Sequence, residues 1–111
     1  MSFLNIAIFG TGISAEEHFK TIKKFKKLRV CCVFGRNIKR LNKLEKKWNV
    51  NIYKDKKKLF FNEKVDLVLI ANQNFYHYQD AMFSLKMGAN IILEKPISTN
   101  FKDTKKLADL A

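Results

Sequence analysis

The sequence predicts an α/β fold, in which an open parallel sheet carries helices on both of its faces. Two observations lead to this prediction. Short apolar runs alternate with segments whose apolar residues recur every three or four positions, and a glycine-rich turn separates the first run from the first helical segment. Alternating strands and helices form βαβ units, whose right-handed crossovers make the sheet parallel. The length of 111 residues suits one domain, residues 1–111, with one core.

Strands are expected where the short apolar runs occur. They are residues 3–9, 28–34, 51–53, 66–71 and 90–93. The run 28–34 is apolar at nearly every position, which is typical of a strand that is buried on both faces of its sheet. Pro96 has no amide hydrogen to donate, so we expect it to end the fifth strand.

The helices are predicted from apolar spacing and from capping residues. The first helix is expected over residues 13–27, with Phe19, Ile22 and Phe25 on one stripe. The second is expected to be capped by Asn37, and its apolar positions are Ile38, Leu41, Leu44 and Trp48. A short basic helix or turn is expected over 55–62.

Two more helices are expected in the second half of the chain. Asn74 can cap the fourth helix, and Gly88 can end it in a left-handed conformation. The apolar face of that helix would hold Tyr78, Ala81, Met82 and Leu85. Asn100, with Asp103 three residues later, resembles a capping box for a last helix.

The charge of the chain is strongly basic, with 22 Lys and Arg against 10 Asp and Glu and a net charge of +12. Such a balance can indicate a nucleic-acid partner. Here the lysines are spread along the helical segments, as on solvated helix faces. Neither a helix-turn-helix pattern nor a stripe of aromatic residues and arginines is present. We therefore expect no nucleic-acid partner.

The apolar runs, such as 67–71, are far shorter than the ~20 residues that span a membrane. No basic and then apolar leader opens the chain. The two cysteines, Cys31 and Cys32, are adjacent in a predicted strand, where successive side chains point to opposite faces, so they are not expected to bond each other. No second cysteine pair suggests a metal site, and none is predicted. These features predict a cytoplasmic protein with reduced thiols and no membrane contact.

The glycine turn Gly10-Thr11-Gly12-Ile13-Ser14-Ala15 has the pattern G-x-G-x-x-A. Gly10 allows a tight turn, Gly12 lets a pyrophosphate approach the backbone, and Ala15 lets the helix lie close to the strand. The helix N-terminus supplies free N–H groups and partial positive charge. Because the turn lies between a predicted strand and a predicted helix, the sequence indicates a Rossmann-type site for NAD or NADP.

The end of the second strand indicates which dinucleotide is preferred. A carboxylate there would bind both ribose hydroxyls of NAD, but the chain has Gly35-Arg36-Asn37. Arg36 could pair with a 2′-phosphate or stack on adenine, which favours NADP, although it could also be an ordinary exposed arginine.

A third motif, Glu94-Lys95-Pro96, ends the fifth strand. Ligands of open parallel sheets bind at the carboxyl ends of the strands, so this turn is expected to face the cofactor crevice. Lys95 could donate a proton to a substrate oxygen there.

Three motifs in this order resemble the N-terminal domain of the Gfo/Idh/MocA family (glucose–fructose oxidoreductase, inositol dehydrogenase and rhizopine catabolism). They are the glycine turn, the segment 71–77, which resembles the family loop ending in Asn-x-x-His, and Gly88 followed by Glu94-Lys95-Pro96. The resemblance extends over essentially all 111 residues. In the loop, Gln73 stands where the family usually has proline.

The resemblance implies an oxidoreductase that transfers hydride between NAD(P) and a sugar-like or cyclitol-like alcohol or ketone. It implies catalytic roles for Lys95 and His77, with Asn72, Asn74, His77 and Glu94 to Pro96 beside the cofactor. The other expected cofactor contacts are Gly10, Thr11, Gly12, Ile13 and Arg36. A binding module or nucleotide sensor without chemistry is the alternative, but it would have no use for Glu-Lys-Pro.

Members of the family also have a second domain with most of the substrate contacts, which we do not recognise in these 111 residues. We therefore expect the chain by itself to bind nucleotide with little turnover, because hydride transfer needs a positioned substrate. Helix faces that a second domain would cover could also associate, so a homo-oligomer is possible.

Overall fold

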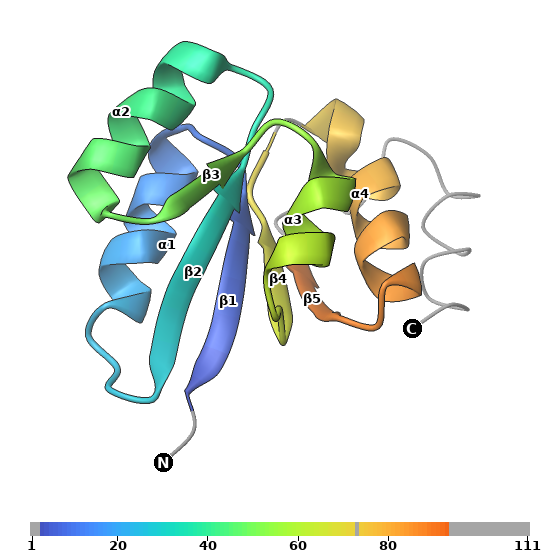
Figure 1. The fold of residues 1–111 in the computed structure, drawn as a ribbon, viewed down its shortest axis with the longest axis horizontal. Coiled ribbons are helices and arrows are strands. Elements are labelled where there is room, and N and C mark those ends of the chain that lie inside the picture. The colour runs from blue at the N-terminus through green and yellow to red at the C-terminus, as the bar shows by residue number, and fades with distance from the viewer. Residues whose placement is uncertain (1–2, 73, 94–111) are drawn as a thin grey trace.

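A computed structural model describes residues 3–72 and 74–93, which form a parallel five-stranded sheet with the order β3-β2-β1-β4-β5 (Figure 1). The strands are β1 (Leu4–Phe9), β2 (Leu28–Phe34), β3 (Asn51–Tyr53), β4 (Leu67–Ile70) and β5 (Asn90–Leu93). The helices are α1 (Ile13–Ile22), α2 (Ile38–Trp48), α3 (Lys56–Asn62) and α4 (Asn74–Lys86). The α/β fold and its parallel sheet are confirmed.

Two apolar cores lie on opposite faces of the sheet. One contains Ile6 and Ile8 of β1 together with residues of α1 and α2, and the other contains Ala7 and Phe9 with residues of α3 and α4. Figure 1 shows the same division, with α1 and α2 on one side of the sheet and α3 and α4 on the other. Since β1 contributes to both cores, its side chains must be apolar on both faces, which explains the near-continuous apolar run.

The order of the strands brings together the glycine turn after β1 and the loops after β2 and β4. β1 lies at the centre and pairs with β2 and β4, which come from different halves of the chain. The strand order reverses at this point, so the loops after β1, β2 and β4 leave the sheet beside one another. Ligands of open α/β sheets bind in the crevice that forms at such a reversal.

The predicted helix over residues 13–27 is too long. α1 ends at Ile22, and the chain then turns through the bonds Lys24 N–H to Thr21 O and Phe25 N–H to Ile22 O. Phe25 consequently leaves the expected stripe and is exposed. Local periodicity continues past Ile22, but the chain must turn back to start β2 at Leu28, and that tertiary requirement decides where the helix ends.

The other boundaries agree with the sequence to within a residue or two. Asn37 caps α2 by accepting a hydrogen bond from the amide of Arg40, and Asp55 caps α3 in the same way through Lys57. Gly88 has a φ of 89°, as expected of a left-handed stop after α4. Pro96 and the last predicted helix lie outside the described residues.

One strand departs from regular pairing. Along β1 and β2, Ile6 pairs with Val30 but Ala7 pairs with Cys32, so Cys31 is an extra residue in β2. This is a β-bulge, which cancels the strict alternation of side chains. The Sγ atoms of Cys31 and Cys32 lie 3.5 Å apart, and the prediction that the two thiols point apart is therefore wrong. Both cysteines are free thiols.

Within residues 3–72 and 74–93, no helix combines the length and the apolar character that crossing a membrane requires.

Candidate nucleotide-binding site

The glycine turn between β1 and α1 has one glycine that the fold requires and one that leaves space. Gly10 has a φ of 141°, and a Cβ built on it would lie 2.5 Å from the carbonyl oxygen of Ala71. Gly12 has an extended backbone and is the N-cap of α1 without a side-chain cap, and a Cβ built on it would meet no atom within 4 Å. Gly10 therefore brings the turn against the β4 loop, while Gly12 leaves the N-terminus of α1 open.

A cavity of about 400 Å³ opens at this turn. Its lining comes from the loops after β1, β2 and β4 and from the start of two helices: Gly10, Thr11, Gly12, Ile13, Ser14, Phe34, Gly35, Arg36, Asn37, Arg40, Ala71, Asn72 and Tyr76. No acidic side chain is among these lining residues. The cavity therefore combines free helix N–H groups, glycine backbone and arginine, a set that suits a phosphate-rich ligand.

Six residues that the sequence assigned to the cofactor lie together in this cavity: Gly10, Thr11, Gly12, Ile13, Arg36 and Asn72. Sequence reasoning missed Arg40 and Tyr76. Arg40 was detectable, since it lies four residues after Arg36 and just inside a predicted helix start. The lining role of Tyr76 depends on the packing of α4 against the sheet, for which the sequence has no local signal.

A second hollow of about 430 Å³ continues from the glycine turn along α2. Arg40 lines both hollows, and Lys43 and Lys47 follow it on the same helix. Lys47 Nζ lies 2.6 Å from Glu16 Oε1 of α1, and this contact holds the pKa of Glu16 below its usual value. The wall of the site along α2 is thus basic, with one of its lysines paired to a carboxylate.

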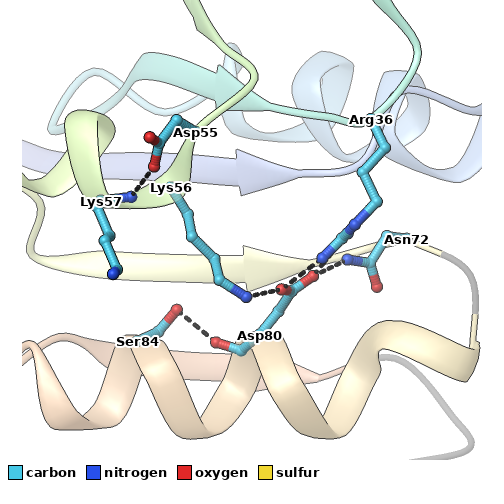
Figure 2. A network of polar contacts seen from close by, with 7 residues as sticks. All are labelled: Arg36, Asp55, Lys56, Lys57, Asn72, Asp80 and Ser84. Atoms are coloured by element: carbon cyan, nitrogen blue, oxygen red, sulfur yellow. Dashed lines mark hydrogen bonds and ion pairs between the residues drawn. The ribbon is translucent and has the colours of Figure 1, made fainter.

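Arg36 does not extend freely into the cavity. Its two terminal nitrogens donate to the two carboxylate oxygens of Asp80 at 3.1 and 3.0 Å (Figure 2). Its guanidinium carbon lies 3.7 Å from the centre of the Tyr76 ring, and the side chain is 33% exposed. The hydrogen-bonding edge of Arg36 is therefore directed toward α4, and the planar group forms part of the cavity wall.

Asp80 is the centre of a polar network beneath the cavity. The carboxylate is fully buried, and it accepts hydrogen bonds from Arg36, Lys56 and Asn72. Figure 2 shows these side chains converging on α4 from the ends of β2 and β4 and from α3. Lys56 Nζ lies 2.9 Å from Asp80 Oδ1. One buried carboxylate thus connects three separate segments to α4. A buried charge has lost its hydrating water, and these hydrogen-bond donors replace it.

Asn72 links this network to the cavity. Its Nδ2 donates to Asp80, while its Oδ1 is buried and has no hydrogen-bond partner among the described residues. A buried acceptor without a partner is costly, and a ligand donor that enters the cavity could satisfy it.

His77, which the resemblance places beside the cofactor, is buried in the described structure. Its side chain is 1% exposed, its Nε2 is 2.8 Å from the carbonyl oxygen of Asn72, and it does not line the described cavity. His77 therefore holds the backbone of the Asn72 loop from inside the protein. Its catalytic role stays a prediction.

The remaining predicted residues cannot be placed against the cavity. The sequence predicted Asn74 as the cap before the fourth helix, whereas in the structure it is the first residue of α4. Its side chain lies outside the described part of the chain. Glu94, Lys95 and Pro96 also lie outside the described residues. β5 ends at Leu93, on the edge of the sheet next to β4.

Comparison with known proteins agrees with this geometry. The family model for an oxidoreductase family with an NAD-binding Rossmann fold, GFO_IDH_MocA, matches residues 4–111. The chain is 26% identical over 109 residues to an uncharacterised oxidoreductase of Synechocystis, covering 97% of this chain and 29% of that protein. It is 23% identical to scyllo-inositol 2-dehydrogenase (NADP(+)) of Bacillus subtilis, covering 97% of this chain and 33% of the enzyme.

The fold is also similar to that of solved structures. GenD2 from gentamicin A biosynthesis, in complex with NAD, matches with a TM-score of 0.94 and 19% identity, over 100% of this chain and 32% of that one. The chain thus spans about a third of the length of the proteins it matches.

Proposed function

Because the chain belongs to the GFO_IDH_MocA oxidoreductase family, as the match over residues 4–111 shows, we propose that it is the cofactor-binding part of an enzyme that transfers hydride between NAD(P) and a sugar-like or cyclitol-like alcohol or ketone. The observation that carries the proposal is the cavity at the N-terminus of α1, with Gly12 leaving open space above the helix. A pyrophosphate there would meet free N–H groups and the positive end of the helix dipole.

The polar groups of the cavity fit the rest of a dinucleotide. The buried Asn72 Oδ1 lacks a partner among the described residues and can accept a hydrogen bond from the cofactor.

The bound nicotinamide would supply the hydride chemistry. We propose that Lys95, between Glu94 and Pro96, exchanges the substrate hydroxyl proton. His77 supports the same site indirectly, through its contact with the Asn72 carbonyl.

The first test is a calorimetric titration of the chain with NADPH and NADH, repeated with Gly12→Asp. Gly12 is an N-cap with an extended backbone, where aspartate is favoured, so folding stability should be unchanged or rise by a few tenths of a kcal/mol. Binding of both nucleotides should be lost, because the new carboxylate would repel the pyrophosphate and fill its space. Unchanged binding in the variant would remove the glycine turn from the site and overturn the proposal.

We further propose a preference for NADPH over NADH. The described lining of the first cavity has no carboxylate to accept the ribose hydroxyls, and the exposed Arg40 lines both that cavity and the second hollow along α2. Since Asp80 engages the hydrogen-bonding edge of Arg36, we assign the 2′-phosphate contact to Arg40 and leave Arg36 as a flat surface for adenine.

Arg40→Ala tests this assignment. The ratio of NADPH to NADH affinity should fall about tenfold or more, as expected when a charge-assisted hydrogen bond is lost. The control is Lys39→Ala, which removes a neighbouring exposed positive charge that does not line the cavity. An equal fall in both variants would indicate only a general effect of net charge. No fall with Arg40→Ala would contradict the assignment.

The substrate and the assembly are proposals as well. The inositol dehydrogenase among the relatives supports a polyol or sugar substrate.

We propose little turnover by these 111 residues alone, because the relatives are about three times as long. An assay against a panel of sugar alcohols would contradict this if the chain reduced cofactor at ordinary enzyme rates. Exposed Phe25 and Phe61 support association into a homo-oligomer, and the two free thiols support a cytoplasmic location.

A further inference from the structure

The β-bulge in β2 creates a pair of adjacent thiols that do not line the nucleotide cavity. Cys31 is the extra residue, and its Sγ lies 3.6 Å from the carbonyl oxygen of Ile6 and 3.5 Å from Cys32 Sγ. Cys32 is fully buried, whereas Cys31 is partly exposed. The two sulfur atoms therefore face one another at a point that solvent can reach from the side of Cys31.

A carboxylate completes a cluster with these thiols. Glu63 follows α3 as its C-cap residue, and one of its oxygens lies within 4.8 Å of both sulfur atoms. Its Oε2 accepts hydrogen bonds from Tyr53 Oη at 2.6 Å and from Asn51 Nδ2 at 2.8 Å. β3 thus orients a carboxylate toward two thiols of β2.

A disulfide is a poor explanation for this arrangement. Consecutive Cα atoms lie ~3.8 Å apart, and disulfides usually need at least ~4.4 Å between them, so a bond between Cys31 and Cys32 would be strained. A tetrahedral thiophilic cation with metal–sulfur bonds of ~2.3 Å instead requires its sulfur ligands ~3.8 Å apart. The observed 3.5 Å is close to that separation and far from a covalent S–S bond of ~2.05 Å.

We propose that Cys31, Cys32 and Glu63 form a binding site for a thiophilic divalent cation of the Zn²⁺ class, with its fourth position open to water. Binding replaces the two thiol protons, which leave to solvent, by one cation, and the three negative ligands outweigh its charge by one. Tyr53 and Asn51 act as the outer groups that orient the carboxylate. The cation would join β2 to the end of α3. Sequence reasoning excluded a metal because it looked for a second cysteine pair and gave Glu63 no role.

Proton release makes the site pH-dependent. The cation binds thiolates and displaces the thiol protons, so cation affinity should rise with pH. Glu63 and Arg29 are the charged side chains that act on the pair.

Cobalt is the probe, because thiolate-bound Co²⁺ absorbs in the near ultraviolet and visible regions. The chain, reduced with a phosphine and freed of metal, is titrated with Co²⁺ and then with Zn²⁺. The chain has two cysteines, so a thiolate charge-transfer band reports this pair alone. We expect one equivalent of Co²⁺ to bind, Zn²⁺ to displace it, and the Tm to rise with cation concentration, since binding to the native state stabilises it.

The variants separate the site from general metal binding. Cys31→Ser should abolish most of the charge-transfer band, and Glu63→Gln should weaken affinity at least tenfold, with Glu45→Gln, an exposed carboxylate on α2, as the matched control. Tyr53→Phe should weaken affinity about tenfold as an outer-group change. The absence of a band in a sample with two titratable thiols would overturn the proposal. A Tm that falls on adding the cation would do the same, because it would place binding in the unfolded chain.

Discussion

Gly10→Ala is expected to destabilise the domain by about 3 kcal/mol or more, a large part of the ~5–15 kcal/mol that a domain of this kind has. Two penalties combine at this position. The backbone φ of 141° is strained for a residue with a side chain, and the new Cβ would lie 2.5 Å from the carbonyl oxygen of Ala71. That oxygen belongs to the backbone directly after β4, which pairs with β1 on one side and with β5 on the other, so it cannot move aside cheaply. Urea unfolding of the purified variants measures the loss.

Two other glycines separate the two penalties. Gly88→Ala keeps the strain, at a φ of 89°, but its Cβ would meet open space, so the cost should be about 1 kcal/mol. Gly12→Ala has neither penalty and should cost less than ~1 kcal/mol, since alanine is only a poorer N-cap than glycine, while it weakens nucleotide binding. If Gly10→Ala costs no more than Gly88→Ala, the contact with Ala71 does not restrict the turn as we infer.

Asp80→Ala is expected to cost about 3–5 kcal/mol, the usual penalty for removing one partner of a buried ion pair. The variant would leave Arg36 and Lys56 without the carboxylate that they share, and Asn72 Nδ2 without its acceptor. The loss of stability should appear in urea unfolding. Weaker cofactor binding should accompany it in calorimetry, since Arg36 and Asn72 line the cavity.

Asp55→Ala is the matched control for that experiment. Asp55 is an exposed aspartate that caps α3 next to Lys56, and its removal should cost only ~1 kcal/mol and leave nucleotide affinity unchanged. Asp80→Asn keeps the shape of the side chain but not its charge, and should lie between the two. Equal losses for Asp80→Ala and Asp55→Ala would show that the buried network adds little to the fold.

Local patterns in the sequence were sufficient to predict the fold and the glycine turn that lines the cavity. Apolar runs without polar alternation predicted strands buried on both faces, and the cores on the two sides of β1 confirm them. The glycine turn could be recognised because its chemistry is local: the strand, turn, N-cap and helix are consecutive in the chain. The family followed from three such local motifs, and the match over residues 4–111 confirms it.

Which side chains meet across the sheet depends on how the helices pack, and local patterns do not show it. The sequence analysis assigned no role to Asp80, but α4 packs so that its carboxylate accepts hydrogen bonds from the end of β2, from α3 and from the β4 loop. The same packing engages the two terminal nitrogens of Arg36 with Asp80 and makes the side chain part of the cavity wall. Tyr76 lines the cavity, whereas His77, the next residue of α4, lies in the interior, because adjacent positions on a helix face different directions.

The thiol pair shows the same limit within a single strand. Alternation predicted that Cys31 and Cys32 would point apart, and it fails because the pairing of β1 with β2 requires one extra residue on β2. The periodicity of a sequence depends only on residues that are close along the chain, whereas a bulge arises from the pairing of two strands. Patterns within one segment therefore determined the elements and the glycine turn, and contacts between distant segments determined the buried carboxylate, the cavity wall and the cysteine cluster.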